Sequence, residues 1–450
     1  MEIKIAYIGG GSRGWAWGLM SDLAGAEDLS GSVYLYDIDF EAAKANETIG
    51  NRYSPNWIYK AVETPGEALT GADFVIISIL PGTFDEMESD VHTPEKYGIW
   101  QSVGDTAGPG GILRAMRTAP MFEEIAENIR KYAPDAWVIN YTNPMTLCVR
   151  TLYRVFPEIK AFGCCHEVFG TQSLLTKVVE EEFGVTPERD DIKVNPVSVN
   201  HFTWLTSARW QNVDLFPLYA KFCEKYKDGY SKEKVDVNWM NNYFMSEEKV
   251  KMDLFRRFGW IAAAGDRHLA EFCPGKWYLE SRERVAEMHF GLTPVSWRKQ
   301  ELQERLEKSR KLLSGELPVE IKKTGEEGVR QMRAILGLGD LVTNVNLPNR
   351  GQIPNLPIGA VVETNAVFRA GTVTPVMAGE IPAEILPLVG RVCAEQEALN
   401  KALGNRDVNG IFQQFAGDPL VTCGYEDAKK LFQEMCENTK EYLTSYDLSI

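Results

Sequence analysis

The chain has 450 residues, a length sufficient for two or three domains. Of these residues 44% are hydrophobic and 25% are charged, which is typical of a globular protein. Its 48 Lys and Arg stand against 63 Asp and Glu, and the net charge of −15 argues against nucleic acid or an anionic membrane as the main partner. Because no stretch has the apolar length of a membrane helix and the N-terminus lacks a signal-peptide pattern, we expect a cytoplasmic protein.

The first third of the chain alternates strand patterns with helix patterns. Strands are predicted over residues 3–8, 33–36, 58–62, 73–80, 136–141 and 160–164. Helices are predicted over residues 12–29, 40–51, 112–132 and 145–155. Strands that alternate with helices form a parallel sheet with helices on both faces. We therefore predict a doubly wound, Rossmann-type α/β domain over residues 1–195.

The pattern changes in the second half of the chain, for which we predict a mixed α+β domain over residues 196–450. This domain should pack closely on the first one and shape its crevice, because no flexible linker separates them. The predicted elements are a strand-rich stretch at 193–206, a mostly helical stretch at 217–258, a charged helix at 297–313, antiparallel strands within 342–377, and helices at 383–403 and 425–443.

A glycine-rich turn follows the first predicted strand and opens the first predicted helix. Gly9, Gly10 and Gly11 let the backbone approach a pyrophosphate, and the helix that follows Ser12 favours its negative charge. Asp37 ends the second strand, where a carboxylate can accept hydrogen bonds from ribose hydroxyls, which favours NAD over its 2′-phosphorylated form. The alternatives are a purely structural turn and, for Asp37, a helix cap.

A thiol, an imidazole and a carboxylate stand together directly after the strand at 160–164, as Cys165, His166 and Glu167. His201 follows another strand-like run, so Cys165 and His201 can meet where strands end at a ligand crevice. Two protein ligands with open positions suit a catalytic metal. The alternative is a buried cysteine and a hydrogen-bonded core histidine. The other seven of the eight cysteines are expected to be reduced structural thiols.

Two further stretches have the character of a binding site. Residues 101–111 form a long glycine-rich loop before a helix, and long loops in compact domains are usually functional. Asn143 follows the fifth strand, where its amide can reach a ligand. The alternatives are a simple connection for the loop and helix capping before Pro144 for Asn143.

Together these motifs, with Arg114, Arg117 and the segment at 346–357, resemble glycoside hydrolase family 4, the NAD- and metal-dependent glycosidases. The resemblance implies a Rossmann domain like that of lactate and malate dehydrogenases, and a homodimer or homotetramer. It also implies a reaction in which NAD oxidises C3 of the sugar, the C2 proton is removed and the leaving group is eliminated. Water then adds and the hydride returns, while a divalent metal, typically manganese, holds the C2 and C3 oxygens.

The resemblance also assigns roles to individual residues. It makes Cys165 and His201 the metal ligands, Asn143 a substrate-binding amide and His166 the acid that protonates the leaving oxygen.

The base that removes the C2 proton is less fixed by the resemblance. Several family members use a tyrosine near the segment that resembles residues 265–272, and no tyrosine stands there. Asp266 or His268 must then act, and Asp266 is placed first. This departure from the family pattern leaves the base open.

The sequence Cys-His-Glu-Val at 165–168 resembles the α-galacturonidase subgroup, so a small uronide is the expected substrate and Glu167 is expected to bind sugar hydroxyls. The substrate carboxylate needs a cation, for which Arg267, Lys276 and Arg350 are candidates by location. The alternatives are an α-glucuronidase or α-galactosidase of the same family, an NAD-dependent 2-hydroxy acid dehydrogenase, and a nucleotide-sensing protein without turnover.

Overall fold

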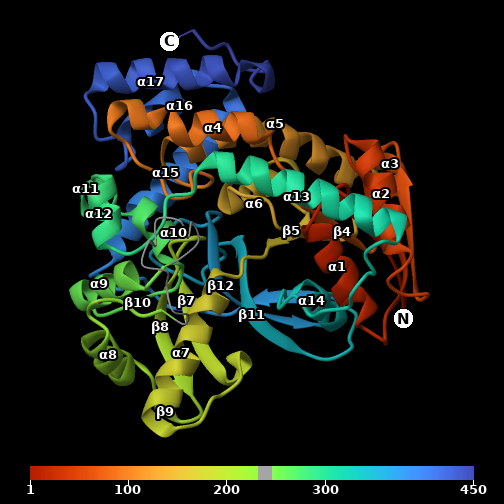
Figure 1. Ribbon diagram of the computed structural model, residues 1–450, viewed down its shortest axis with the longest axis horizontal. Coiled ribbons are helices and arrows are strands. Elements are labelled where there is room, and N and C mark those ends of the chain that lie inside the picture. Colours follow the sequence, from red (N-terminus) through yellow and green to blue (C-terminus); the bar gives the residue numbers. More distant parts are fainter. Residues whose placement is uncertain (232–245, 450) are drawn as a thin grey trace.

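A nine-stranded sheet forms the centre of the computed structural model, which describes residues 1–231 and 246–449 (Figure 1). Its strands follow the order β13-β12-β11-β6-β5-β4-β1-β2-β3. The part from β3 to β6 is parallel and has the order of a Rossmann domain, which confirms the predicted fold class. These strands are β1 (Glu2–Ile8), β2 (Ser30–Tyr36), β3 (Trp57–Val62), β4 (Phe74–Ile77), β5 (Trp137–Asn140) and β6 (Lys160–Gly163).

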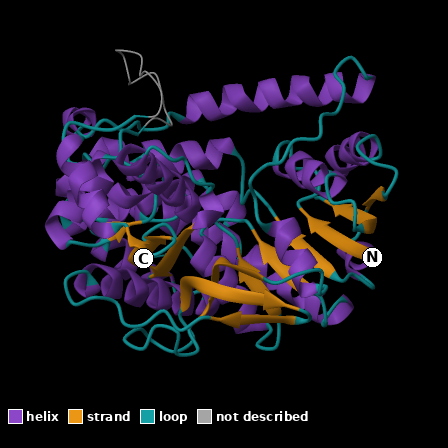
Figure 2. Ribbon diagram, turned by 90° about the horizontal axis from the view of Figure 1, so that it is seen from below, coloured by secondary structure: helices purple, strands orange, loops and turns teal. Residues whose placement is uncertain are grey.

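Helices connect the parallel strands and pack against the sheet, as Figure 2 shows. β4 is buried along its whole length, as its continuous apolar sequence predicts for a central parallel strand. The connecting helices are α1 (Trp15–Ala24), α2 (Phe40–Gly50), α3 (Pro65–Leu69), α4 (Phe84–His92), the 3₁₀ turn η1 (Pro94–Tyr97), α5 (Gly108–Tyr132), α6 (Met145–Val155) and α7 (Glu167–Phe183).

Several predicted boundaries differ from the structure. The first helix begins at Trp15 instead of residue 12, because the turn continues through Gly14 with a φ of 144°. The strand predicted at 73–80 ends at Ile77. The short helices α3 and α4 were not predicted, although each begins with a capping box, at Thr64 and Thr83, that the sequence carries.

The second half of the chain completes the sheet of the first half. β11 (Leu341–Pro348) pairs antiparallel with β6 through Asn346 and Gly163, and β12 (Val361–Arg369) and β13 (Thr372–Pro375) extend the sheet outward. The antiparallel strands predicted within 342–377 are therefore present, and they share one sheet with the parallel strands. Residue 195 lies inside a strand of the second sheet, so the domain division at this residue stays a prediction.

A smaller antiparallel sheet has the order β10-β8-β7, with β9 paired to β8. Helices surround it, and residues 232–245 of the stretch predicted as mostly helical lie outside the described residues. The elements are η2 (Arg189–Asp191), β7 (Ile192–Val197), β8 (Trp204–Trp210), β9 (Val213–Asp214), α8 (Phe216–Lys225), α9 (Lys249–Phe258), β10 (Ile261–Ala262), α10 (Asp266–Phe272), α11 (Gly275–Tyr278) and α12 (Arg282–Glu287).

The remaining helices cover the outside of the molecule. The predicted charged helix is α13, which lies across α2 and α4 (Figure 1), and α15 to α17 pack beside α5 and α6. None of the described helices combines the length and apolar character that crossing a lipid bilayer requires. These helices are α13 (Val295–Ser314), α14 (Gly328–Ile335), α15 (Leu386–Asn405), α16 (Val408–Gly417), α17 (Tyr425–Asn438) and the turn η4 (Lys440–Tyr442).

Candidate active site

The glycine turn after β1 has no room for side chains. Gly9 has a φ of 91°, and a Cβ atom there would lie 2.1 Å from the carbonyl oxygen of Ser78. A Cβ atom on Gly10 would lie 2.8 Å from the Cα atom of Leu35. The bare backbone next to α1 is what a bound pyrophosphate requires, so the turn fits a dinucleotide.

Asp37 closes this turn from the end of β2. Its carboxylate accepts hydrogen bonds from the backbone N–H groups of Gly11 at 2.8 Å and Asp39 at 2.9 Å. The cap of α2 is Asp39, which accepts from Ala42, so Asp37 does not cap that helix. Burial raises the pKa of Asp37. The proposed contact of Asp37 with ribose stays a prediction.

Asn46 also holds the glycine turn, and the sequence patterns did not single it out. Its side-chain amide donates to the carbonyl oxygens of Gly10 at 2.8 Å and Ser12 at 3.1 Å. The N–H of Trp17 donates to the Asn46 oxygen at 2.9 Å, so the amide is fixed in place. Asn46 therefore positions the backbone that would bind a dinucleotide.

Two histidines and one carboxylate from three separate segments form a cluster. Asp105, His201 and His268 each place a possible ligand atom within 4.8 Å of the others, and the two imidazole rings lie 3.9 Å apart. Asp105 comes from the glycine loop before α5, His201 from the turn after β7, and His268 from α10. The Nδ1 atoms of both histidines are buried and have no hydrogen-bond partner within the described part of the chain.

The electrostatics of this cluster suit a divalent cation. Burial lowers the pKa of His201 to about 3, with a further contribution from His268, so the His201 imidazole is neutral. Burial alone would raise the pKa of Asp105, but Arg114, His201 and His268 outweigh it and bring it to about 2. Neutral imidazoles and an ionised carboxylate are the forms in which these side chains bind metals. The residues present therefore fit a divalent metal.

Cys165 lies beside the turn that carries His201, but it is not part of the cluster of two histidines and Asp105. The Asn200 side chain donates a hydrogen bond to its sulfur. Burial, Glu363 and Glu167 raise the pKa of Cys165 well above the usual range, which favours the thiol. The role of Cys165 as a metal ligand stays a prediction, and the structure adds Asp105 and His268 to the residues that could hold the metal.

The turn with His201 has a strained backbone. Ser198 has a φ of 132° and His201 a φ of 65°, and residues other than glycine rarely adopt such values. Strain of this kind persists only where surrounding contacts enforce it, and it concentrates at functional sites.

Glu363 of β12 supplies those contacts. Its buried carboxylate accepts hydrogen bonds from Thr203, from Asn344 at 2.8 Å and from Asn200 at 3.4 Å. Its backbone N–H donates to the carbonyl oxygen of Ser198 at 2.8 Å. Glu363 was not predicted from the sequence, because a single carboxylate within a strand pattern does not indicate which groups it will contact.

Replacing Glu363 with Ala should loosen the His201 turn and weaken metal binding. Three side chains would lose their acceptor, and changes behind metal ligands typically cost about 10- to 100-fold in affinity. The measurement is a titration of the purified protein with Mn²⁺ by calorimetry. Glu380, which is exposed, provides a matched Glu→Ala control. Equal Mn²⁺ affinity in both variants would contradict the role of Glu363.

The remaining predicted residues lie around the cluster. The Glu167 carboxylate accepts from the N–H of Gly265 at 2.7 Å and lies 3.7 Å from Nε2 of His268 and 3.8 Å from Nε2 of His166. Burial opposes ionisation of Glu167, but His268 and His201 outweigh it and lower its pKa to about 2. The Asn143 amide lies 3.4 Å from the Asp105 carboxylate.

His166 connects this site to the glycine turn. Its side chain is 56% exposed, its Nδ1 lies 3.3 Å from Glu326, and its ring stacks on Trp15 with centroids 6.5 Å apart. Trp15 is the first residue of α1, directly after the glycine turn. The hydrogen bond with Glu326 raises the pKa of His166. The glycine turn and the cluster therefore border one region.

Asp266 is held by residues at the start of α9. Its buried carboxylate accepts from the N–H of Lys251 at 2.9 Å and from the side chain of Ser246, both near the start of α9. Burial and Glu248 raise its pKa to about 6. Among the described residues, these contacts tie Asp266 to α9, so its role as the base stays a prediction without support from geometry.

Glu271 holds the loop that carries Asp105. Its buried carboxylate oxygen Oε1 accepts hydrogen bonds from the N–H groups of Val103 at 2.7 Å and Gly104 at 2.9 Å. Burial raises its pKa from 4.5 to about 8. The folded protein therefore keeps a proton on Glu271 that the unfolded chain releases above pH 4.5.

Glu271→Gln should reduce the loss of stability between pH 5 and pH 8. Across this window Glu271 is ionised in the unfolded chain but still protonated in the fold, so stability falls by up to about 1.4 kcal/mol per pH unit as the pH rises. Gln keeps the acceptor oxygen and does not ionise, whereas Glu271→Ala removes the acceptor and should destabilise at every pH. Urea unfolding midpoints at several pH values test this, and an unchanged pH slope in Glu271→Gln would contradict it.

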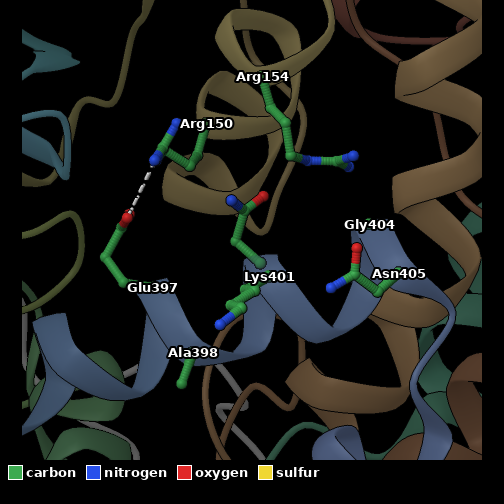
Figure 3. Close-up of a pocket in the computed structure, with 8 residues that line it drawn as sticks. Arg150, Arg154, Glu397, Ala398, Lys401, Gly404 and Asn405 are labelled. Carbon is green, nitrogen blue, oxygen red and sulfur yellow. Dashed lines mark hydrogen bonds and ion pairs between the residues drawn. The ribbon is translucent and has the colours of Figure 1, made fainter.

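One open cavity of about 710 Å³ lies apart from the predicted site residues, between α6 and α15 (Figure 3). Arg150 on its wall forms a two-pronged ion pair with Glu397, in which Nε donates to Oε1 at 3.0 Å and Nη2 to Oε2 at 3.1 Å. Arg154 and Lys401 also line it. No residue of this wall was predicted to act in the site.

The fold and the site are those of a Rossmann-type enzyme with a candidate metal centre at the strand ends. The family model described as Family 4 glycosyl hydrolase matches residues 4–181, and the model of the Family 4 C-terminal domain matches residues 197–421. The chain therefore belongs to family 4 of the glycosyl hydrolases.

Individual relatives agree with this membership. The chain is 60% identical to an α-galacturonidase of Thermoanaerobacterium saccharolyticum over 99% of its length and 98% of that protein. The crystal structure of LplD from Bacillus subtilis has a TM-score of 0.93 and 52% identity, covering 97% of this chain and 100% of that one. A 6-phospho-α-glucosidase from gut microorganisms, in complex with NAD and Mn²⁺, shares the fold with a TM-score of 0.80 and 19% identity, over 98% of this chain and 99% of that one.

Proposed function

We propose that the protein is an α-galacturonidase that uses NAD and a divalent metal, with manganese as the expected ion. The observation that carries the proposal is the shared border of the two candidate sites, where His166 stacks on Trp15 of α1 and approaches Glu167 beside His268. A redox cofactor and a metal at one border can act on one sugar. The substrate class is supported by the relative at 60% identity.

When bound, NAD would accept and return a hydride and the metal would polarise sugar oxygens. Of the chain's own residues, Gly9, Gly10, Gly11 and Ser12 would hold the pyrophosphate, and Asp37 would bind ribose. His201 and Asp105 would hold the metal, together with Cys165 at the edge of the site.

The proton transfers fall to the residues around the cluster. His166 would protonate the leaving oxygen, because its hydrogen bond with Glu326 raises its pKa and so favours the protonated imidazole. His268 would remove the C2 proton, because it lies in the cluster and Glu167 orients it, whereas Asp266 contacts α9. Asn143 and Glu167 would bind sugar hydroxyls.

The expected working state is a cytoplasmic homodimer or homotetramer that acts on small uronides. The negative net charge favours a small substrate, which a few local cations can hold, over nucleic acid.

The test is cleavage of galacturonide, glucuronide and galactoside with NAD, Mn²⁺ and a reductant in deuterated water. Preferred cleavage of galacturonide with deuterium at C2 is expected. Cleavage that persists without NAD and metal and leaves no label at C2 would sink the mechanism. Preference for glucuronide or galactoside would move the substrate within the family, and net NADH formation on a 2-hydroxy acid would favour a dehydrogenase. Cys165→Ser should lower Mn²⁺ dependence or activity, and full retention would remove Cys165 from the metal site.

A further inference from the structure

Arg114 is a buried cation in the second turn of α5, close to the candidate metal centre. The residue is 7% exposed, and its Nε donates to the carbonyl oxygen of Asn143 at 3.1 Å. Its two terminal nitrogens have no hydrogen-bond partner among residues 1–231 and 246–449. They are accessible to solvent. A buried guanidinium normally uses its whole fork of donors. The free end of Arg114 therefore points to a missing acceptor.

Arg117 on the same helix has a guanidinium group whose donors are bonded to acceptors. Arg117, one turn further along α5, donates to both carboxylate oxygens of Asp90 and to the carbonyl oxygen of Pro81. With the described residues Arg114 forms no such ion pair within 4.0 Å, although its charge acts on Asp105. If Arg114 served only to balance Asp105, direct pairing would be the better arrangement.

The three cations that the sequence suggested for the substrate carboxylate are either bonded to other groups or exposed. Arg267 donates to the carbonyl oxygens of Gly291 and Ser102 and to Thr293, and so cross-links loops. Lys276 and Arg350 are exposed. A uronate carboxylate that enters beside Asp105 and Glu167 needs a cation, because both of these groups are anionic.

We propose that Arg114 receives the C6 carboxylate of the galacturonide through its two terminal nitrogens. The planar fork matches a carboxylate bidentately, and burial strengthens the pair by excluding water. Asn143, whose carbonyl oxygen fixes Nε of Arg114 and whose amide lies 3.4 Å from Asp105, couples this contact to the rest of the site. The inference rests on the proposed galacturonidase function and assigns the residue that sets its preference for acidic sugars.

The test compares the binding of galacturonate and galactose, which differ only at C6, to the protein loaded with NAD and Mn²⁺. Calorimetry on Arg114→Gln should show galacturonate affinity lowered by about 10- to 100-fold, the cost of losing a charged hydrogen-bonded pair. Galactose affinity should stay within about threefold, since a neutral C6 hydroxyl gains little from the charge. Arg150→Gln removes an arginine that lines the cavity between α6 and α15 and should change neither affinity.

Equal losses for both sugars, or no loss for either, would overturn the role of Arg114. If Arg114→Gln does not fold by circular dichroism, Arg114→Lys decides, because it keeps the charge but loses the fork. A galacturonate affinity reduced selectively in Arg114→Lys supports the proposal, and wild-type affinity overturns it. A wild-type protein that neither cleaves galacturonides nor prefers galacturonate would refute the proposed function itself, which is a separate outcome.

Discussion

His201→Asn is expected to lower Mn²⁺ affinity by more than about 100-fold, beyond the effect of changes behind metal ligands, and to abolish glycosidase activity. His201 is 3% exposed, and its neutral imidazole is directed toward Asp105 and His268. Asn tolerates the φ of 65° at this position, so the backbone of the turn should survive the change. Calorimetric titration with Mn²⁺ measures the loss directly, without dependence on turnover.

The chain offers a matched control for this variant. His289 also has a positive φ, of 53°, and it contacts Glu247, which is not part of the cluster. His289→Asn repeats the same chemical change in a similar backbone conformation and should keep wild-type Mn²⁺ affinity. If the two variants bind Mn²⁺ equally well, His201 is not a metal ligand.

Gly9→Ala is expected to lower NAD affinity by about 100-fold, because a displacement of about 1 Å at a positioning turn can cost that much. The new methyl group would lie 2.1 Å from the carbonyl oxygen of Ser78, and the φ of 91° is unfavourable for alanine. The turn must therefore move away from the position where a pyrophosphate fits. Titration of NAD, followed by calorimetry or fluorescence, tests the expectation.

Gly71→Ala separates strain from displacement of the turn. Gly71 has a φ of 74°, and no atom of the described residues lies within 4 Å of a Cβ atom placed there. This variant should lose about 1–2 kcal/mol of stability from backbone strain alone and keep its NAD affinity. Wild-type NAD binding in Gly9→Ala would show that the turn does not hold the cofactor.

The sequence patterns predicted the parallel half of the sheet because its strands are short apolar runs separated by helices. They also predicted strands at 342–377, but they did not predict that one of these strands pairs with β6. The pairing of Asn346 with Gly163 joins residues far apart in sequence, and a strand pattern indicates which face is buried, not which edge it meets. A division of the chain into domains requires knowing which strands pair, and the sequence pattern does not give that.

The candidate site was also only partly predicted, because a sequence pattern does not show which segments meet in space. Asp105 lies in the glycine-rich loop at 101–111 that was predicted to be functional. A carboxylate in a loop belongs to no periodic pattern, so the sequence does not indicate what it faces. Asp266 and His268 are two residues apart on α10, and side chains at that spacing point to different sides of a helix. One contacts α9 and the other the cluster, a distinction that only the position of α10 in the fold decides.

The pairing of β11 with β6 has a consequence for how this protein is made. A chain emerging from the ribosome can form the parallel strands once residue 163 is available, but the outer edge of β6 stays without a partner until residues 341–348 are synthesised. An exposed strand edge is a template for association between chains. Slow translation of the second half should therefore promote aggregation of nascent chains, and helper proteins that shield sheet edges should raise the yield of native enzyme.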